Sequence, residues 1–123
     1  AGETFTFTIA DLSSNRLLRR IGIRQTNFTD VWNLGSLTHP QYQGQGYMTE
    51  AAIAIMAFGF DQLNAAQIEA GYALWNKSSQ RVLEKIGMKF IEYIPHSFQK
   101  KGRWIESNKM SINQQEWLAL NLN

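Results

Sequence analysis

The chain has 123 residues, of which 44% are hydrophobic and 18% are charged, and its formal net charge is +2. This composition indicates a single globular domain over residues 1–123 that can bury a proper core, and it excludes an intrinsically disordered chain. The net charge allows an anionic ligand but is too small to indicate nucleic-acid binding. The absence of cysteine excludes disulfides, thiolate zinc sites and a cysteine nucleophile.

The sequence shows no sign of export or membrane insertion. Its longest unbroken apolar run, residues 51–60, is about half as long as a membrane-spanning helix. No signal peptide is visible, so we expect a cytoplasmic protein without a membrane partner. The sequence lacks an initiator methionine and opens on a strand-like alternation, so we also expect an N-terminal truncation.

The first third of the chain predicts three β-strands. Residues 4–10 alternate between threonine and apolar side chains, which is the period of a half-buried strand. A polar turn leads to a second strand over 16–26, and another turn leads to a third over 31–39. Pro40 ends the third strand, because proline cannot donate to a β-ladder.

A long apolar helix and a fourth strand follow. Residues 47–63 are apolar on nearly every side, so this helix should be buried against a sheet. Residues 65–74 predict a strand that lies beside the third one, in a parallel or splayed arrangement, because a helix connects the two.

The last third predicts a short helix and a hairpin. The amphipathic helix over 76–87 begins at Asn76, a favourable N-cap, and Gly87 allows a left-handed end. Two strands, 89–95 and 105–112, flank the polar turn 99–103. The predicted order is therefore β-β-β-α-β-α-β-β, an α/β sheet that is antiparallel at its start and at its end.

A glycine-rich turn directly before the long helix is the clearest candidate for a binding site. Gly44 and Gly46 are one residue apart, and no lysine or acidic residue lies between Pro40 and Thr49. The first N–H groups of a helix have no partner within it, and together with the helix dipole they favour an anion. Glycines let the backbone approach a ligand closely, so a diphosphate held here needs no lysine.

Two common phosphate-binding motifs do not fit this turn. A P-loop would continue from the glycine into Lys and Ser or Thr, but Tyr47 and Met48 follow Gly46. A dinucleotide fingerprint requires a third small residue where Thr49 stands. The antiparallel strands at the start also argue against a doubly wound sheet.

Three blocks of the sequence together resemble one enzyme family. Gln41-x-x-Gly44-x-Gly46 is similar to the motif with which GNAT acetyltransferases hold the pyrophosphate of coenzyme A. The wider segments that resemble the RimJ/RimL branch of this family are, in order, HPQYQGQGYMTEAAIAIMAFGF, WNKSSQRVLEKIGMKF and GRWIESNKMSINQQEW. The match extends from about Asn33 to the C-terminus. It implies a GNAT-like fold: a mixed, largely antiparallel sheet with a splayed central strand pair and a buried central helix.

The resemblance also implies how acetyl-CoA would bind. The pantetheine arm would pair with the backbone of residues 36–38, whose N–H groups would polarise the thioester carbonyl. Asn76 would contact the pantetheine, and Ser79, the implied catalytic residue, would meet the departing sulfur. The implied cofactor-binding residues are Ser36, Leu37, Thr38, Gln41, Tyr42, Gln43, Gly44, Gln45, Gly46, Tyr47 and Asn76.

Several roles stay open at this point. The conceivable general bases are Glu69, Glu92, Glu106 and His96. The two histidines of the chain are isolated, so no metal site is predicted. Asn76 and Ser79 also have purely structural interpretations, as a helix N-cap and as a common first-turn residue.

The function implied by the resemblance is acetyl-CoA-dependent N-acetylation of a primary amine, either a protein N-terminus or a small amine such as a polyamine or an aminoglycoside. The alternative is a non-catalytic acyl-CoA-binding or dimerising remnant of the same fold. Complete family members carry two helices before the second strand, which usually wall the acceptor site; these helices are either absent from the protein or left out of this sequence. A homodimer is therefore expected, because the first two strands would otherwise leave apolar surface uncovered.

Overall fold

The computed structural model describes residues 3–11, 16–35 and 47–120. Within these ranges the predicted order of strands and helices is confirmed, and one further helix follows the last strand. The elements are β1 (Thr4–Asp11), β2 (Arg16–Gln25), β3 (Val31–Leu34), α1 (Tyr47–Asp61), β4 (Gln67–Ala73), α2 (Lys77–Lys85), β5 (Lys89–Lys100), β6 (Arg103–Asn113) and α3 (Gln114–Leu120).

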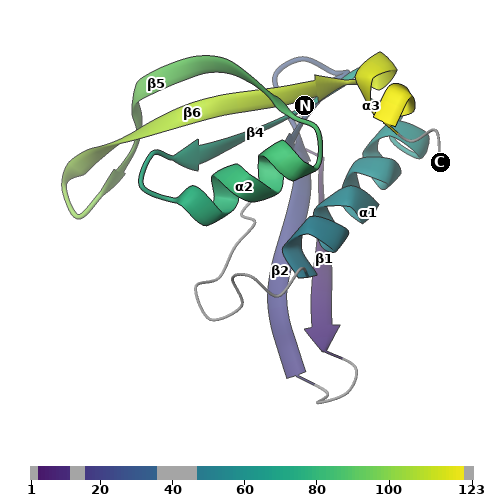
Figure 1. The fold of residues 1–123 in the computed structure, drawn as a ribbon, viewed down its shortest axis with the longest axis horizontal. Helices are drawn as coiled ribbons and strands as arrows, with labels where there is room; N and C mark the ends of the chain where they lie inside the picture. The colour runs from purple at the N-terminus through teal and green to yellow at the C-terminus, as the bar shows by residue number, and fades with distance from the viewer. Residues whose placement is uncertain (1–2, 12–15, 36–46, 121–123) are drawn as a thin grey trace.

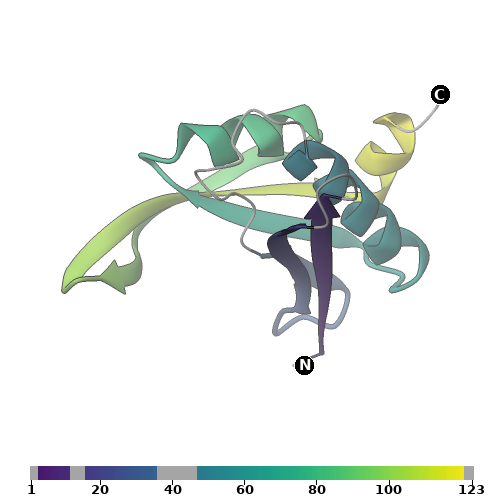
Figure 2. The same cartoon turned by 90° about the horizontal axis from the view of Figure 1, so that it is seen from below.

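The described strands form one mixed sheet in the order β1-β2-β3-β4-β6-β5. Every neighbouring pair is antiparallel except β3 and β4, which are parallel because α1 connects them. Helices α1 and α2 lie on the same side of this sheet, and the long β5–β6 hairpin extends beyond the end of β4 (Figures 1 and 2). The predicted α/β fold with a largely antiparallel sheet is confirmed.

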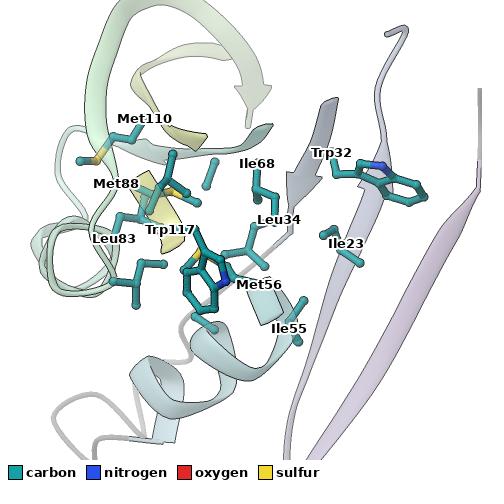
Figure 3. Close-up of a cluster of buried hydrophobic side chains, with 14 of the residues drawn as sticks. Ile23, Trp32, Leu34, Ile55, Met56, Ile68, Leu83, Met88, Met110 and Trp117 are labelled. Carbon is teal, nitrogen blue, oxygen red and sulfur yellow. The ribbon is translucent and has the colours of Figure 1, made fainter. Parts of the chain in front are cut away.

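The core lies between α1 and the middle of the sheet (Figure 3). Ile23 of β2 and Ile68 of β4 are fully buried. A Cβ added at Gly59 of α1 would lie 2.8 Å from Ile68 Cδ1 and 2.9 Å from Ile23 Cδ1. The helix therefore rests directly on the sheet, as its apolar sequence predicts, and glycine allows this close approach.

The helix α1 ends two residues earlier than the sequence predicts. Asn64 has a positive φ of 57°, and the backbone N–H of Ala65 donates to the Gly59 carbonyl at 3.0 Å. Asparagine is one of the few residues besides glycine that readily adopts this left-handed conformation. The third strand is also shorter than predicted: β3 ends at Leu34, and residues 36–39 lie outside the described residues.

The hairpin strands are longer than the sequence predicts. A two-residue turn, Lys101 and Gly102, joins β5 to β6, with φ values of 53° and 78°. Positive φ at both central positions is characteristic of the two-residue hairpin turn whose backbone twist matches the twist of the flanking strands. The strands therefore continue up to Lys100 and from Arg103, where the sequence predicts a wider turn.

The helix α3 was not predicted, although the sequence carries a signal for it. Asn113 Oδ1 accepts from the backbone N–H of Glu116 at 2.8 Å, and Glu116 accepts from the Asn113 N–H at 2.9 Å. This reciprocal pair is a capping box. The pKa of Glu116 lies below its ordinary value. The main cause is the hydrogen bond from the Asn113 N–H, and the second is the Lys89 ammonium, whose Nζ lies 3.0 Å from the Glu116 carboxylate. The helix then buries Trp117, whose ring stacks on Phe60 at 5.6 Å.

Among the described residues, no helix combines the length and the apolar character needed to cross a lipid bilayer.

Candidate functional site

The strands β3 and β4 separate shortly after they meet. They pair over three residue pairs, from Val31 with Gln67 to Asn33 with Glu69. Beyond that point β4 continues to Ala73 with β6 as its only paired strand, while Leu34 of β3 pairs with β2. The facing backbone edges of the two strands therefore have no partner strand among the described residues. The predicted splayed strand pair is confirmed.

A cavity of about 600 Å³ opens at this separation. Such a volume is within the range of small-molecule sites. Its walls come from β3, β4, the first turn of α2 and the far half of the hairpin. The polar and charged side chains that line it include Asn33, Tyr72, Asn76, Ser79, Lys100 and Ser107.

The first turn of α2 supplies one wall of this cavity. Asn76 Oδ1 accepts from the backbone N–H of Ser79 at 3.2 Å, which confirms Asn76 as the N-cap of the helix. Ser79 is 6% exposed and lines the same cavity. At the other end of this turn-and-helix unit Gly87 has a φ of 94°, the left-handed conformation predicted for it.

A second polar pair lies on the strands beneath α2. Asn108 Nδ2 of β6 donates to the hydroxyl oxygen of Tyr72 on β4 at 3.0 Å. Tyr72 is 8% exposed and lines the cavity. Tyr93 stands opposite Asn108 on β5, but its side chain is exposed and its hydroxyl donates to the Glu106 carboxylate. That hydrogen bond is the main reason why the pKa of Tyr93 is raised, with burial and the charge of Glu106 acting in the same direction.

The candidate general bases lie away from the described walls of the cavity. Glu69 and Glu92 share Lys109, whose Nζ is 3.7 Å and 3.5 Å from their carboxylates. Glu106 accepts from Tyr93, and the His96 ring contacts Trp104 edge-on at 5.3 Å. None of these four predicted candidates lines the cavity among the described residues.

The charge in the described part of the wall is positive. Lys100, near the tip of the hairpin, is the charged residue among the lining side chains, and its Nζ lies 5.6 Å from the centre of the Trp75 ring. This cation–π contact joins the hairpin to the turn before α2. A cationic wall suits an anionic ligand.

Comparison with known proteins identifies the family. Residues 1–89, well over half of the chain, match the model of the acetyltransferase (GNAT) domain. The chain belongs to the GNAT acetyltransferase family.

Individual relatives support this assignment. The chain is 34% identical over 87 residues to the uncharacterized N-acetyltransferase YnaD of Bacillus subtilis, covering 71% of this chain and 51% of that protein. It is 30% identical over 80 residues to the spermidine N(1)-acetyltransferase of Escherichia coli, covering 65% and 43%. The crystal structure of a GNAT-family acetyltransferase from Bacillus anthracis superimposes with a TM-score of 0.79 at 26% identity, covering 89% and 66%. The chain thus spans about half or less of the length of these two curated relatives.

Within the GNAT framework, the structure brings only some of the predicted residues together. Asn76 and Ser79 meet at the cavity. Tyr47 is the first residue of α1. The other predicted cofactor-binding residues, in the stretch 36–46, lie outside the described residues, so the predicted pyrophosphate loop stays a prediction.

Sequence reasoning missed several residues of the cavity wall. Tyr72 shares the buried face of β4 with Ile68 and Ala70, and this alternation makes it look like an ordinary core residue. The sequence signal that could have identified Tyr72 is its position four residues before Asn76, close in the chain to the N-cap of α2. Lys100 falls within the predicted polar turn 99–103, whereas in the structure it is the last residue of β5.

Proposed function

We propose that this protein transfers an acetyl group from acetyl-CoA to a primary amine. The observation that carries the proposal is the cavity between the separated ends of β3 and β4, which has Asn76 and Ser79 in its wall. Membership in the GNAT family gives the same chemistry for the fold. Assignment to the RimJ/RimL branch stays a prediction.

The site has features that fit acetyl-CoA. The pantetheine arm carries two amides, and the unpaired strand edges beyond Asn33 offer backbone groups to an extended ligand of this kind. The glycine pair at 44 and 46 immediately precedes α1, so a pyrophosphate would meet the free N–H groups of that helix. Lys100 would add a favourable charge on the wall.

The residues of the chain would divide the work of the transfer. Acetyl-CoA would supply the acetyl group as a thioester. Backbone N–H groups of residues 36–38 would stabilise the negative charge that develops on the carbonyl oxygen. Asn76 would hold the pantetheine, and Ser79 would donate a hydrogen bond to the departing sulfur. The amine must reach the carbonyl carbon without its extra proton, which water or a base removes.

The acceptor is proposed only as a class, a primary amine. The similarity to a protein named spermidine N(1)-acetyltransferase supports a small polyamine, and a protein N-terminus is the other acceptor we propose to test. The decisive assay follows thiol release from acetyl-CoA with spermidine, other small amines and a short peptide. Binding of coenzyme A without thiol release for any amine would favour the non-catalytic alternative.

Coenzyme A should stabilise the fold. At ~100 times its dissociation constant, a ligand that binds only the folded state contributes about 2.7 kcal/mol. For a domain of this size, each kcal/mol raises the melting temperature by roughly 4 °C. We therefore expect a rise of roughly 10 °C in a thermal melt with millimolar coenzyme A. An unchanged melting temperature with both coenzyme A and acetyl-CoA would refute the proposed site.

Self-association is a separate expectation. The sequence predicts a homodimer in solution, with a second copy covering apolar surface of the first strands. Light scattering over a range of protein concentrations measures this directly. A monomer at every concentration would contradict it without affecting the proposed chemistry.

A further inference from the structure

We propose that the acceptor is a small primary amine that also carries a carboxylate, and that Lys100 binds this carboxylate. The inference rests on the proposed acetyl transfer and narrows its acceptor class. Lys100 would be a specificity-determining residue, because its ammonium would favour amines with a nearby negative charge. Spermidine, which carries only positive charge, is the competing acceptor and is measured in the same assay.

The position of Lys100 relative to the proposed cofactor is the first argument. The start of α1, the first turn of α2 and the tip of the β5–β6 hairpin follow one another in this order along the long axis of the molecule (Figures 1 and 2). The proposed pyrophosphate site is at the start of α1, and Ser79, which would meet the sulfur, lies in the first turn of α2. Lys100 ends β5 and lines the cavity from the hairpin. The hairpin wall would therefore lie beyond the sulfur, on the side left for the acceptor.

The charge of the cavity wall is the second argument. Lys100 is the charged residue among the described lining side chains, and this part of the wall contains no carboxylate. The stretches 12–15 and 36–46, which lie outside the described residues, contain no Asp or Glu that could add one. A polyamine would bring further ammonium groups towards Lys100 without a carboxylate to balance them. A carboxylate on the acceptor would be attracted to the same wall.

The ammonium of Lys100 is held in place and still has its charge available. Its Nζ lies 5.6 Å from the centre of the Trp75 ring, and no carboxylate among the described side chains forms an ion pair with it. An aromatic ring attracts a cation but has no net charge, so the ammonium can still donate to an anion. Lys109 differs in this respect, because its Nζ lies 3.7 Å and 3.5 Å from the carboxylates of Glu69 and Glu92.

The side chains beside Lys100 indicate a small organic acceptor. Trp75 and Phe98 line the same cavity and are 63% and 45% exposed, so their rings are open to contact with a carbon skeleton. One lysine balances one negative charge, which is the charge of a carboxylate, whereas a phosphate group carries about −1.5 to −2. The wall therefore fits an amino acid or a related amino carboxylic acid.

The test uses pairs of acceptors that differ only by the carboxylate. Thiol release from acetyl-CoA is followed with tyrosine and tyramine, with lysine and cadaverine, and with spermidine. For the wild-type protein, kcat/KM should be about tenfold higher for the member of each pair that has the carboxylate, because a charged hydrogen bond at a partly open site lies between a buried and an exposed ion pair in strength. Spermidine should give a lower kcat/KM than tyrosine or lysine.

Substitutions of Lys100 test whether this residue causes the preference. Lys100→Met removes the charge and keeps a side chain of similar length, so kcat/KM for tyrosine should fall by about tenfold, mainly through KM, while tyramine stays within about twofold. Lys100→Glu should reverse the preference towards tyramine and cadaverine. The matched control is Lys101→Met, since Lys101 is the next residue but does not line the cavity. This control should keep the wild-type preference.

The dissociation constant of coenzyme A separates the acceptor from the cofactor. Lys100 would act on coenzyme A only at long range, so Lys100→Met should raise this constant by no more than about threefold. A tenfold rise together with an unchanged acceptor preference would assign Lys100 to the cofactor and overturn the inference. Calorimetry measures the constant without an acceptor.

The remaining outcomes distinguish this inference from the proposed function. If the wild-type protein releases no thiol with any amine, both fall. If it is active but prefers spermidine or the acceptors without a carboxylate, only the acceptor class is overturned. An unchanged preference in Lys100→Met, or an equal loss in Lys101→Met, would overturn the role of Lys100, because the preference would then not arise at the cavity wall.

Discussion

Gly46→Val should abolish coenzyme A binding while the protein remains folded. Gly46 directly precedes Tyr47, the first residue of α1, so a branched side chain there would occupy the space through which phosphate oxygens approach the helix N–H groups. We expect the thermal stabilisation by coenzyme A to disappear and the dissociation constant, measured by calorimetry, to rise by more than about 100-fold, which corresponds to roughly 2.7 kcal/mol.

A matched control is available on the same helix. Ala54→Val adds the same branched bulk at an exposed position of α1 and should leave coenzyme A binding intact. If Gly46→Val binds as tightly as Ala54→Val, or if Gly46→Val fails to fold, the glycine serves the turn alone and the pyrophosphate must be held elsewhere.

Ser79→Ala should lower turnover and leave cofactor affinity nearly unchanged. A hydrogen bond to a developing negative charge contributes about 2 to 3 kcal/mol to the barrier, which corresponds to roughly 30- to 150-fold in kcat. The helix cap should survive, because the backbone N–H of Ser79, which donates to Asn76 Oδ1, is kept in the variant. We therefore expect kcat to fall while the dissociation constant of coenzyme A stays within about twofold.

The neighbouring serine provides the comparison for this experiment. Ser78 lies in the same turn of α2 but does not line the cavity, so Ser78→Ala should retain full turnover. Asn76→Ala should have the opposite effect: it should raise the dissociation constant of coenzyme A more than it lowers kcat. Full turnover in Ser79→Ala would make this serine a simple first-turn residue.

Much of the fold could be predicted because its signals are local. The alternation over residues 4–10, the apolar helix before Asp61 and the cap at Asn76 each specify an element within a few residues. The parallel neighbours β3 and β4 follow from the connecting helix, since a strand that is followed by a helix and another strand returns to the same sheet.

The features of the fold and the cavity that the sequence did not predict depend on contacts between residues far apart in the chain. Tyr72 lines the cavity together with Ser79 of α2, and Asn108 of β6 donates to its hydroxyl; neither of these residues is visible in the alternation of β4 itself. Lys100 reaches the cavity wall only because a two-residue turn lengthens the hairpin. The capping box of α3 was readable from Asn113 and Glu116, but it follows a strand without any break in the sequence.

The separation of β3 from β4 has a consequence for the thermodynamics of binding. Each strand is held by its other neighbour, β3 by β2 and β4 by β6, so the gap does not depend on a ligand to keep it open. A ligand that adds its own amides between the two edges would find them already in place and would lose little affinity to reorganisation of the sheet. Binding should then resemble the docking of a strand onto a preformed edge. Most of the conformational entropy lost on binding should come from the ligand's own flexible chain.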